Sequence, residues 1–133
     1  MEQPDVEMTF SPKTYDIDAL GIVSNITYVR WLEDMRTEFL HENLPWDRLQ
    51  DEGIGPVLAE TNIKYHKAVT MGKEVTGKLW VTEVGRTSWR LKFDFVMDGE
   101  TVIEAKQSGM FVDLETKKPR RLPEDLRENM RST

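Results

Sequence analysis

Four long runs of alternating apolar and polar residues, preceded by one helical stripe, constrain the fold of this chain more than any other feature. Between residues 28 and 40 the apolar side chains recur every three or four positions, which predicts a helix with one buried face. After residue 56 the period changes to two, the spacing of strands that bury one face. Such elements bury their apolar faces against each other, so the sequence predicts an α+β domain with a helix on an antiparallel sheet.

The bounds of the expected elements follow from these periods. Residues 6–12 predict a short edge strand that ends at Pro12, and one further helical turn is expected at 46–50. The alternating runs are 57–68, 73–84, 87–97 and 101–114, and a short terminal helix is expected from Pro123. About five strands and one long helix result.

Two finer predictions concern the strands. In the run 57–68 the alternation places Val57, Ala59, Ile63 and Tyr65 on one face. The breaks between the runs are short, and each contains glycine, at 70–73, 83–87 and 97–100. Such breaks predict antiparallel hairpins between all neighbouring strands.

Composition limits the function. The 133 residues, 38% of them hydrophobic, suffice for one core, so a single domain spanning 1–133 is expected. The balance of 18 basic against 24 acidic residues, a net charge of −6, argues against nucleic-acid and membrane-surface partners. The chain has no cysteine, which excludes disulfides, thiolate chemistry and the usual zinc sites. Without a signal peptide or an apolar run of roughly 20 residues, a cytoplasmic protein is expected.

The stretch that carries chemistry leads into the long helix. It reads YDIDALGIVSNITYVRWLEDMRTEFL, residues 15–40, and sets Asp16 and Asp18 before a glycine turn and a helix start. Together with IKYHKAVTMGKEV, GRTSWRL and DLETKKPRRLP, and with the order of the elements, it resembles the hotdog-fold acyl-CoA thioesterases of the 4-hydroxybenzoyl-CoA thioesterase type. The resemblance covers nearly the whole chain and implies a hotdog fold, in which the sheet wraps around one long central helix.

The resemblance implies a catalytic pair in this stretch. By motif position the catalytic carboxylate falls on Asp18, and the backbone N–H that polarises the thioester carbonyl falls on Asn25. The placement suits the chemistry, because a helix start offers unpaired N–H groups and a positive dipole end to a developing oxyanion. A carboxylate beside that oxygen can attack the carbonyl carbon or take a proton from water. The structural alternative is an aspartate that only caps the helix.

Asp16 is expected to support Asp18. Residues two apart in an extended segment point the same way, which leaves two roles open for Asp16: like-charge repulsion on Asp18, or hydrogen bonding to a backbone donor. Many relatives carry an aromatic residue and a histidine after the glycine turn, where this chain has Ser24 and Asn25. No imidazole therefore acts at that position.

A basic cluster in an otherwise acidic chain is the expected site for the phosphates of coenzyme A. It consists of Lys117, Lys118, Arg120 and Arg121 on a surface loop, with Arg86 in a second turn. The alternative is a solvated tail. Tyr28, with Trp31 and Met35, is a candidate to line the acyl pocket, although a helical stripe of this kind more often packs a core.

The remaining ionisable residues of note are expected to be structural. Glu33 and Arg36 match an acid and an arginine of the family and predict an intrahelical ion pair. His41 lies near the helix C-terminus, where the dipole favours a protonated ring. His66 falls on the polar face of a strand, which predicts a solvated surface position.

The sequence therefore predicts a thioester hydrolase that converts an acyl-CoA and water to a carboxylic acid and free CoA. Neither a metal nor a separate cofactor is expected, because coenzyme A is part of the substrate. The resemblance implies a homodimer or homotetramer with the site at the dimer interface. Three alternatives stay open: a non-catalytic acyl-CoA or acyl-carrier binding module, a structural dimer with a vestigial pocket, and an acyl-ACP thioesterase. The catalytic asparagine and histidine of the last class would fall on Leu20 and Ile22, which does not support that chemistry.

Overall fold

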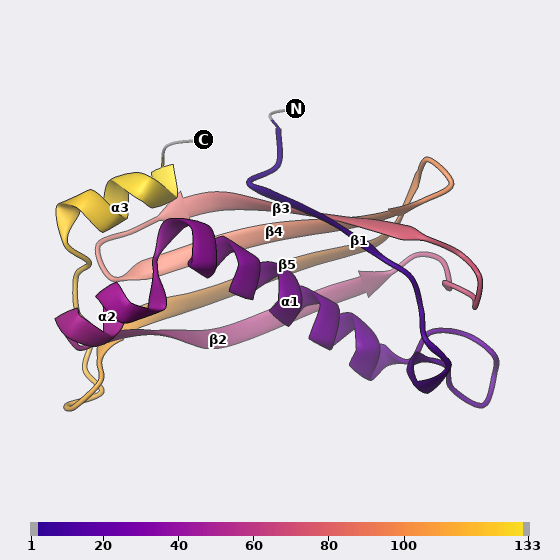
Figure 1. Ribbon diagram of the computed structural model, residues 1–133, viewed down its shortest axis with the longest axis horizontal. Helices are drawn as coiled ribbons and strands as arrows, with labels where there is room; N and C mark the ends of the chain where they lie inside the picture. Colours follow the sequence, from indigo (N-terminus) through magenta and orange to yellow (C-terminus); the bar gives the residue numbers. More distant parts are fainter. Residues whose placement is uncertain (1–2, 132–133) are drawn as a thin grey trace.

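One long helix, α1 (Asn25–Asn43), lies along one face of a five-stranded antiparallel sheet (Figure 1). The structure is a computed structural model that describes residues 3–131. Its strands are β1 (Val6–Phe10), β2 (Ile54–Tyr65), β3 (Val75–Val84), β4 (Ser88–Met97) and β5 (Glu100–Asp113), in the spatial order β1-β3-β4-β5-β2. A 3₁₀ turn at Thr14–Asp16 and the helices α2 (Trp46–Glu52) and α3 (Glu124–Arg131) complete the chain. The predicted α+β arrangement is confirmed.

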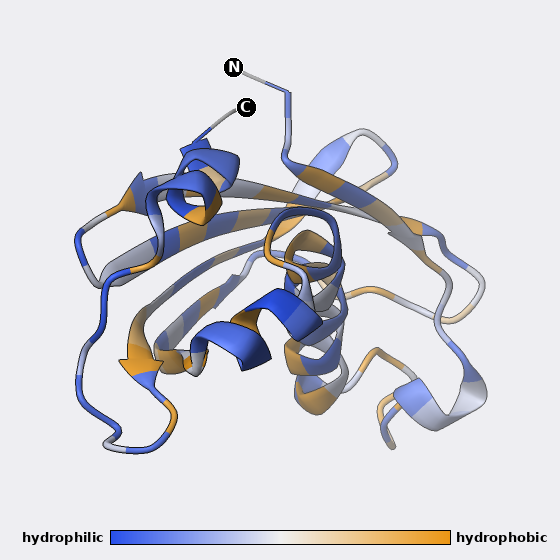
Figure 2. Cartoon of the chain, turned by 60° about the vertical axis from the view of Figure 1, so that its left-hand side comes forward, coloured by the Kyte–Doolittle hydropathy of each residue, from blue (hydrophilic) through white to orange (hydrophobic). Residues whose placement is uncertain are grey.

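β4 illustrates why the chain forms a one-sided sheet. Its side chains at odd-numbered positions, from Trp89 to Met97, are all buried, whereas those at even-numbered positions are partly or fully exposed. β4 pairs with β3 on one side and with β5 on the other, so its apolar face lies at the centre of the sheet. Figure 2 shows hydrophobic and hydrophilic residues alternating along the strands, with α1 beneath the curved sheet.

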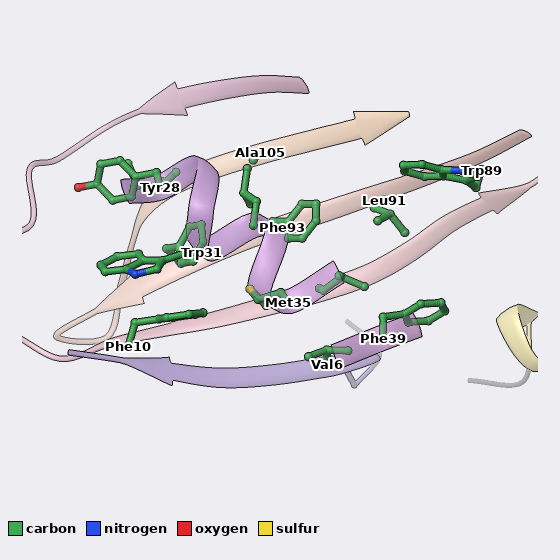
Figure 3. Packing of buried hydrophobic residues seen from close by; sticks show 14 of the residues in the cluster. Val6, Phe10, Tyr28, Trp31, Met35, Phe39, Trp89, Leu91, Phe93 and Ala105 are labelled. Carbon is green, nitrogen blue, oxygen red and sulfur yellow. The ribbon is translucent and has the colours of Figure 1, made fainter. Parts of the chain in front are cut away.

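α1 buries most of the stripe that its period predicts. The buried apolar members are Tyr28, Trp31, Leu32, Met35 and Phe39. Phe10 of β1 stacks on Trp31 with ring centroids 4.9 Å apart, and Figure 3 shows this contact beside Met35 and Phe93. Gly77 on β3 lets the helix approach closely, because a Cβ there would lie 2.7 Å from the Met35 Sδ. The sheet and helix therefore share one aliphatic and aromatic core.

The connection between β2 and β3 is a crossover, so the hairpin predicted at 70–73 is wrong. β2 pairs with β5, whereas β3 pairs with β1 and β4, which separates β2 from β3 in the sheet. The glycine-containing break is only the last part of a longer connection, in which Val69 is fully buried. Burial of Val69 lets this connection pack into the core. The predicted β3–β4 and β4–β5 hairpins are confirmed.

A β-bulge at Ala59 changes which side chains of β2 share a face. The register against β5 shifts by one residue at this position, which moves Val57 to the face opposite that of Ile63 and Tyr65. The single face predicted for these residues is therefore wrong. Val57 and Leu58 are 45% and 40% exposed. β2 is thus a sheet edge with apolar side chains open to solvent.

The remaining elements agree with the sequence. β1 forms the other edge of the sheet, and α2 and α3 occupy the predicted positions. Among the described residues, no helix is both long and apolar enough to cross a membrane.

Candidate active site

A short hairpin, residues 16–24, leads into α1 and carries both aspartates. The Ser24 N–H donates to the Asp16 carbonyl at 2.8 Å, and the Asp18 N–H donates to the Ile22 carbonyl at 2.9 Å. The Gly21 N–H closes the tip by donating to the Asp18 carbonyl at 3.0 Å, with a φ of 80° that favours glycine. These hydrogen bonds fix Asp18 relative to the start of α1.

The crossover between β2 and β3 packs against this hairpin and is hydrogen-bonded to it. The Val69 carbonyl accepts the Val23 N–H at 2.8 Å, and Ile22 forms an isolated β-bridge with Thr70. In Figure 1 this connection lies at the end of the molecule where α1 begins. The part of the topology that the sequence did not predict thus positions the candidate site.

The side chain of Asp18 is exposed, and one of its two carboxylate oxygens accepts hydrogen bonds. Its Oδ1 accepts the N–H of Leu20 at 2.8 Å and that of Ile22 at 3.5 Å. Within residues 3–131 its Oδ2 has no hydrogen-bond partner. One carboxylate oxygen therefore orients the group, and the other is available for chemistry.

Asp16 is 6% exposed and holds the hairpin together. Its Oδ2 accepts the Lys13 N–H at 2.8 Å, and its Oδ1 lies 3.4 Å from the Thr27 hydroxyl that donates to it. Of the two roles that the sequence left open, hydrogen bonding to a backbone donor is the one observed. The two aspartates occupy different environments, because Asp16 ends a 3₁₀ turn and faces inward while Asp18 faces solvent.

The start of α1 offers an unpaired donor. Ser24 is the N-cap, and its Oγ accepts the Ile26 N–H at 3.2 Å, while its carbonyl accepts the Thr27 N–H at 3.0 Å. The Asn25 N–H has no acceptor in the described part of the chain. Helix starts attract negative charge through such free N–H groups and through the dipole. The cap is Ser24 and not an aspartate, so capping does not explain Asp18.

Tyr28 lies behind the hairpin, in the core. It is 2% exposed, and its ring centroid lies 5.6 Å from that of Trp31 and 5.7 Å from that of Tyr65. Burial raises the pKa of its phenol, a hydrogen bond with the Val69 backbone lowers it, and the charges of Tyr65 and Asp18 raise it further. Tyr28 is therefore neutral at ordinary pH and lies close enough to Asp18 for their charges to interact.

The predicted phosphate-binding residues come together, but far from Asp18. Lys117, Lys118, Arg120 and Arg121 lie between β5 and α3, and Arg86 lies between β3 and β4. The two segments adjoin at Phe111, whose N–H donates to the Thr87 carbonyl at 2.7 Å and whose carbonyl accepts the Arg120 N–H at 2.9 Å. Figure 1 shows these loops at one end of the molecule and the hairpin at the other. Between them lies α1, whose 19 residues span about 28 Å.

Two of these basic side chains have partners within the chain. The Arg120 Nη1 donates to the Glu52 carbonyl at 2.6 Å, at the end of α2, and lies 3.4 Å from the Asp113 Oδ2. The Lys117 Nζ donates to the Leu114 carbonyl at 2.5 Å. The other three, Arg86, Lys118 and Arg121, are exposed. Lys117 is exposed as well, but its Nζ is engaged by the Leu114 carbonyl, so these three residues are the stronger candidates for binding a ligand.

The predicted ion pair between Glu33 and Arg36 is present. The Arg36 Nη1 also donates to the Gln107 Oε1 at 2.8 Å, and the Gln107 Nε2 donates to the Thr61 Oγ1 at 3.2 Å. Gln107 is only 3% exposed. These hydrogen bonds link α1 to β5 and β2 through an apolar layer. In the sequence, a lone polar residue on the inner face of β5 was the only sign of them.

Both histidines are exposed, which confirms the surface position predicted for His66, and His41 lies near the C-terminus of α1 as expected. The His66 Nε2 lies 2.9 Å from the Glu104 Oε1, and His41 is exposed in the last turn of α1. In residues 3–131, no three His, Cys, Asp or Glu side chains come together in a way that would hold a metal ion.

A cavity of about 500 Å³ lies at the opposite end of α1 from the hairpin. It sits beneath the C-terminal half of the helix and has mainly apolar walls, among them Phe39, Leu40, Trp89 and Phe111. The sequence carries no motif for this cavity, because its walls come from six elements that lie apart in the chain. The nearest sign was the placement of Leu40 at the margin of the helical stripe.

Comparison with known proteins gives the family. Residues 12–130 match the thioesterase-like superfamily. An acyl-acyl carrier protein thioesterase from Arabidopsis thaliana chloroplasts is 26% identical over 127 residues, which are 91% of this chain and 65% of that protein. A Thermus thermophilus thioesterase complexed with coenzyme A and Zn superposes with a TM-score of 0.83 and 26% identity, over 99% of this chain and 96% of the other. A DHNA-CoA thioesterase from Staphylococcus aureus superposes with a TM-score of 0.84 and 20% identity, over 95% and 88%. The chain therefore belongs to the thioesterase-like superfamily, has the hotdog fold and is a thioester hydrolase.

Proposed function

We propose that this protein hydrolyses acyl-CoA thioesters at the hairpin of residues 16–24, with Asp18 as the reacting carboxylate. One observation carries the proposal: the hairpin that carries the exposed Asp18 carboxylate, with Oδ2 unengaged among the described residues, leads directly into the Asn25 N–H, which has no acceptor in the described structure. Thioester hydrolysis requires a nucleophilic or basic oxygen and a hydrogen-bond donor for the oxyanion. Coenzyme A as the thiol carrier is supported by the Thermus thermophilus relative that is complexed with it.

The Asn25 N–H and the start of α1 stabilise the transition state. As the carbonyl carbon becomes tetrahedral, its oxygen takes up negative charge, which the N–H and the positive end of the helix dipole favour. The donor is part of the backbone and is held in place by the Ser24 cap, so it needs no rearrangement during the reaction.

The Asp18 carboxylate acts by one of two balanced routes. In the first, Oδ2 attacks the carbonyl carbon, the C–S bond breaks with its electron pair on sulfur, and water then cleaves the resulting anhydride. In the second, Oδ2 takes a proton from water, the water oxygen attacks, and the thiolate leaves. Both routes consume one water and release a carboxylic acid and free CoA. A single turnover in heavy-oxygen water reveals the first route when water opens the anhydride at the Asp18 carboxyl carbon, because only that step places the label in Asp18.

A homodimer, alone or within a homotetramer, completes the site. β2 is an unpaired sheet edge with exposed Val57 and Leu58, and such an edge pairs readily with a second strand. A two-fold axis through the middle of β2 makes the pairing antiparallel and exchanges the two ends of the molecule. The basic end of the second copy, with Arg86, Lys118 and Arg121, then lies beside the hairpin of the first. This arrangement brings the phosphates of coenzyme A and the thioester within reach of one site.

The decisive test measures release of free thiol from acyl-CoAs by the native protein and by the Asp18→Asn variant. We expect Asp18→Asn to lose most turnover while it still binds a non-hydrolysable S-alkyl-CoA thioether, because the amide keeps the shape of the carboxylate but not its reactivity. Asp47→Asn, at an exposed position on α2, is the matched control and retains activity.

Other outcomes would replace the proposal. Full activity in Asp18→Asn would show that another residue is the reacting group, and Asp16 would be the next candidate. A native protein that binds the thioether but hydrolyses no acyl thioester would be an acyl-CoA binding module. Hydrolysis of acyl groups only when they are carried by an acyl carrier protein would make that protein, and not CoA, the carrier.

A further inference from the structure

The cavity at the far end of α1 is not used by the chemistry at the hairpin. Its volume of about 500 Å³ lies within the range of small-molecule sites. Phe39 and Leu40 form its helix wall, Trp89 and Phe111 its sheet wall, and Met130 of α3 closes one side. Figure 3 shows Phe39 on α1 and Trp89 on β4 around this end of the core.

The walls of the cavity suit a hydrocarbon. The polar atom of Trp89 is already satisfied, since its Nε1 donates to the Met110 carbonyl at 3.2 Å, so the ring presents only carbon to the cavity. Gly109 makes this position possible, because a Cβ there would lie 2.3 Å from the Trp89 ring. Trp46, which is 64% exposed, contributes a large apolar side chain at the mouth. The charged, imidazole and hydroxyl groups that line the cavity all belong to α1: Glu33, Arg36, Thr37 and His41.

One side of α1 carries apolar side chains both near the hairpin and at the cavity. Ile26 and Val29 are 63% and 49% exposed, although they are apolar. Positions three to four apart lie on one side of a helix, so Ile26, Val29 and Leu40 belong to the same side, which ends at the cavity wall. The solvent side of α1, otherwise polar, is therefore apolar at the catalytic end and again at the cavity.

The charged residues between the two apolar parts of this side are paired with other groups of the chain. Glu33 and Arg36 stand at the near end of the cavity and neutralise each other in an ion pair. Gln107 holds the Arg36 guanidinium at 2.8 Å, which leaves the apolar part of the arginine side chain along the wall.

We infer that this cavity holds the distal part of a long aliphatic acyl chain, so that the substrate is a fatty acyl thioester and not a short or aromatic one. The inference rests on the proposed reaction at Asp18. From Asn25 to Glu33 the helix rises about 12 Å, which an extended alkyl chain covers in roughly ten carbons. Chains shorter than this end on the stripe of Ile26 and Val29, and longer chains enter the cavity.

The test measures binding of S-alkyl-CoA thioethers, from butyl to hexadecyl, to the native protein by calorimetry. We expect the affinity to rise by up to about fourfold for each added methylene, and to keep rising beyond roughly ten carbons. An affinity that stops rising at or below about ten carbons would overturn the inference, as would equal binding of benzoyl-sized and hexadecyl thioethers.

A cavity-filling variant, Leu40→Trp, provides the second measurement. The added ring occupies the cavity, so kcat/KM should fall at least tenfold for chains longer than about ten carbons and stay unchanged for shorter ones. Glu42→Trp is the matched control, because it adds the same ring to an exposed position of the same helix that does not line the cavity. An equal loss for short and long chains in Leu40→Trp would overturn the inference.

Failure of this inference is distinguishable from failure of the proposed function. If the native protein hydrolyses acyl-CoAs without preference for chain length, the thioesterase stands and the cavity is not its acyl site. If it hydrolyses none but binds thioethers more tightly with each methylene, the cavity stands and the catalytic proposal falls. Crystals of the thioether complex in which side chains of a second copy fill the cavity would also overturn the inference.

Discussion

The hydroxyl of Thr27, in the first turn of α1, donates to the backbone carbonyl of Asp16 at 3.3 Å and ties the hairpin to the helix. Among residues 3–131, the hydrogen bonds of Asp18 all go to Leu20, Gly21 and Ile22 of the hairpin. One aspartate therefore holds the turn, and the other faces the solvent where a substrate would bind. The two roles can be separated by experiment.

Substitution of the two aspartates should have opposite effects on stability and turnover. Asp16→Ala removes the acceptor of the Lys13 N–H and the Thr27 hydroxyl, and we expect the free energy of unfolding to fall by about 1–3 kcal/mol. Asp18→Asn keeps an oxygen for the Leu20 N–H, so stability should stay within about 0.5 kcal/mol of the native value while turnover is lost. Urea unfolding and kcat measure the two effects. Equal destabilisation by both substitutions would contradict this division of roles.

The proposed homodimer predicts that two inactive variants restore activity when they are mixed. One carries Asp18→Asn, and the other carries Lys118→Glu and Arg121→Glu. Each mixed dimer has one site with a native Asp18 and native basic residues, so random exchange of equal amounts should recover about a quarter of the native activity. Recovery is measured by thiol release after unfolding and refolding the mixture. Absence of recovery, with mixed dimers demonstrated by mass spectrometry, would rule out a shared site.

Burial of Tyr28 predicts a loss of stability at alkaline pH. Since burial raises the pKa of its phenol, the folded state keeps the proton after the unfolded state has released it. The contribution is complete below the ordinary tyrosine pKa of about 10 and is lost as pH rises through that value towards the higher folded one. As pH rises through this range, the urea midpoint of the native protein should therefore fall more steeply than that of Tyr28→Phe. Parallel curves would contradict the assignment.

The contact between α2 and α3 predicts part of the acid sensitivity. The Arg48 guanidinium donates to both carboxylate oxygens of Asp125, at 2.8 and 3.0 Å, and these hydrogen bonds lower the pKa of Asp125. A lowered carboxyl pKa stabilises the fold above the ordinary value of about 4, and this stabilisation is lost as pH falls through the folded value. Asp125→Asn should flatten the acid limb of stability against pH, measured by urea unfolding. The exposed Asp47→Asn serves as the control and should leave that limb unchanged.

The local parts of the fold were predictable because their signals are local. The alternation from Trp89 to Met97 specifies a strand with one buried face wherever it lies in the sheet. The crossover after β2 was not predictable from Gly72, because a glycine permits a turn without specifying which strands it joins. The bulge at Ala59 was also hidden, since one extra residue changes the facing of a strand without changing its composition.

The candidate site was predictable in part for the same reason. The hairpin and the start of α1 are contiguous in the chain, so Asp18 and Asn25 could be named from the sequence motif. The distance from this hairpin to Arg121 depends on the whole topology, and no spacing along the chain expresses it. The cavity beside Leu40 depends on the packing of six elements and has no linear signature.

The hairpin proposed as the catalytic site and the cavity lie at opposite ends of α1. The hydrogen bonds that orient Asp18 stay within the hairpin, and none of them involves a residue that lines the cavity. In the arrangement proposed above, exchange of Leu40 or Trp89 would change the acyl preference and leave the residues around Asp18 unaltered. Because the length of α1 separates the two sites, the fold allows substrate preference to diverge while the reaction stays the same.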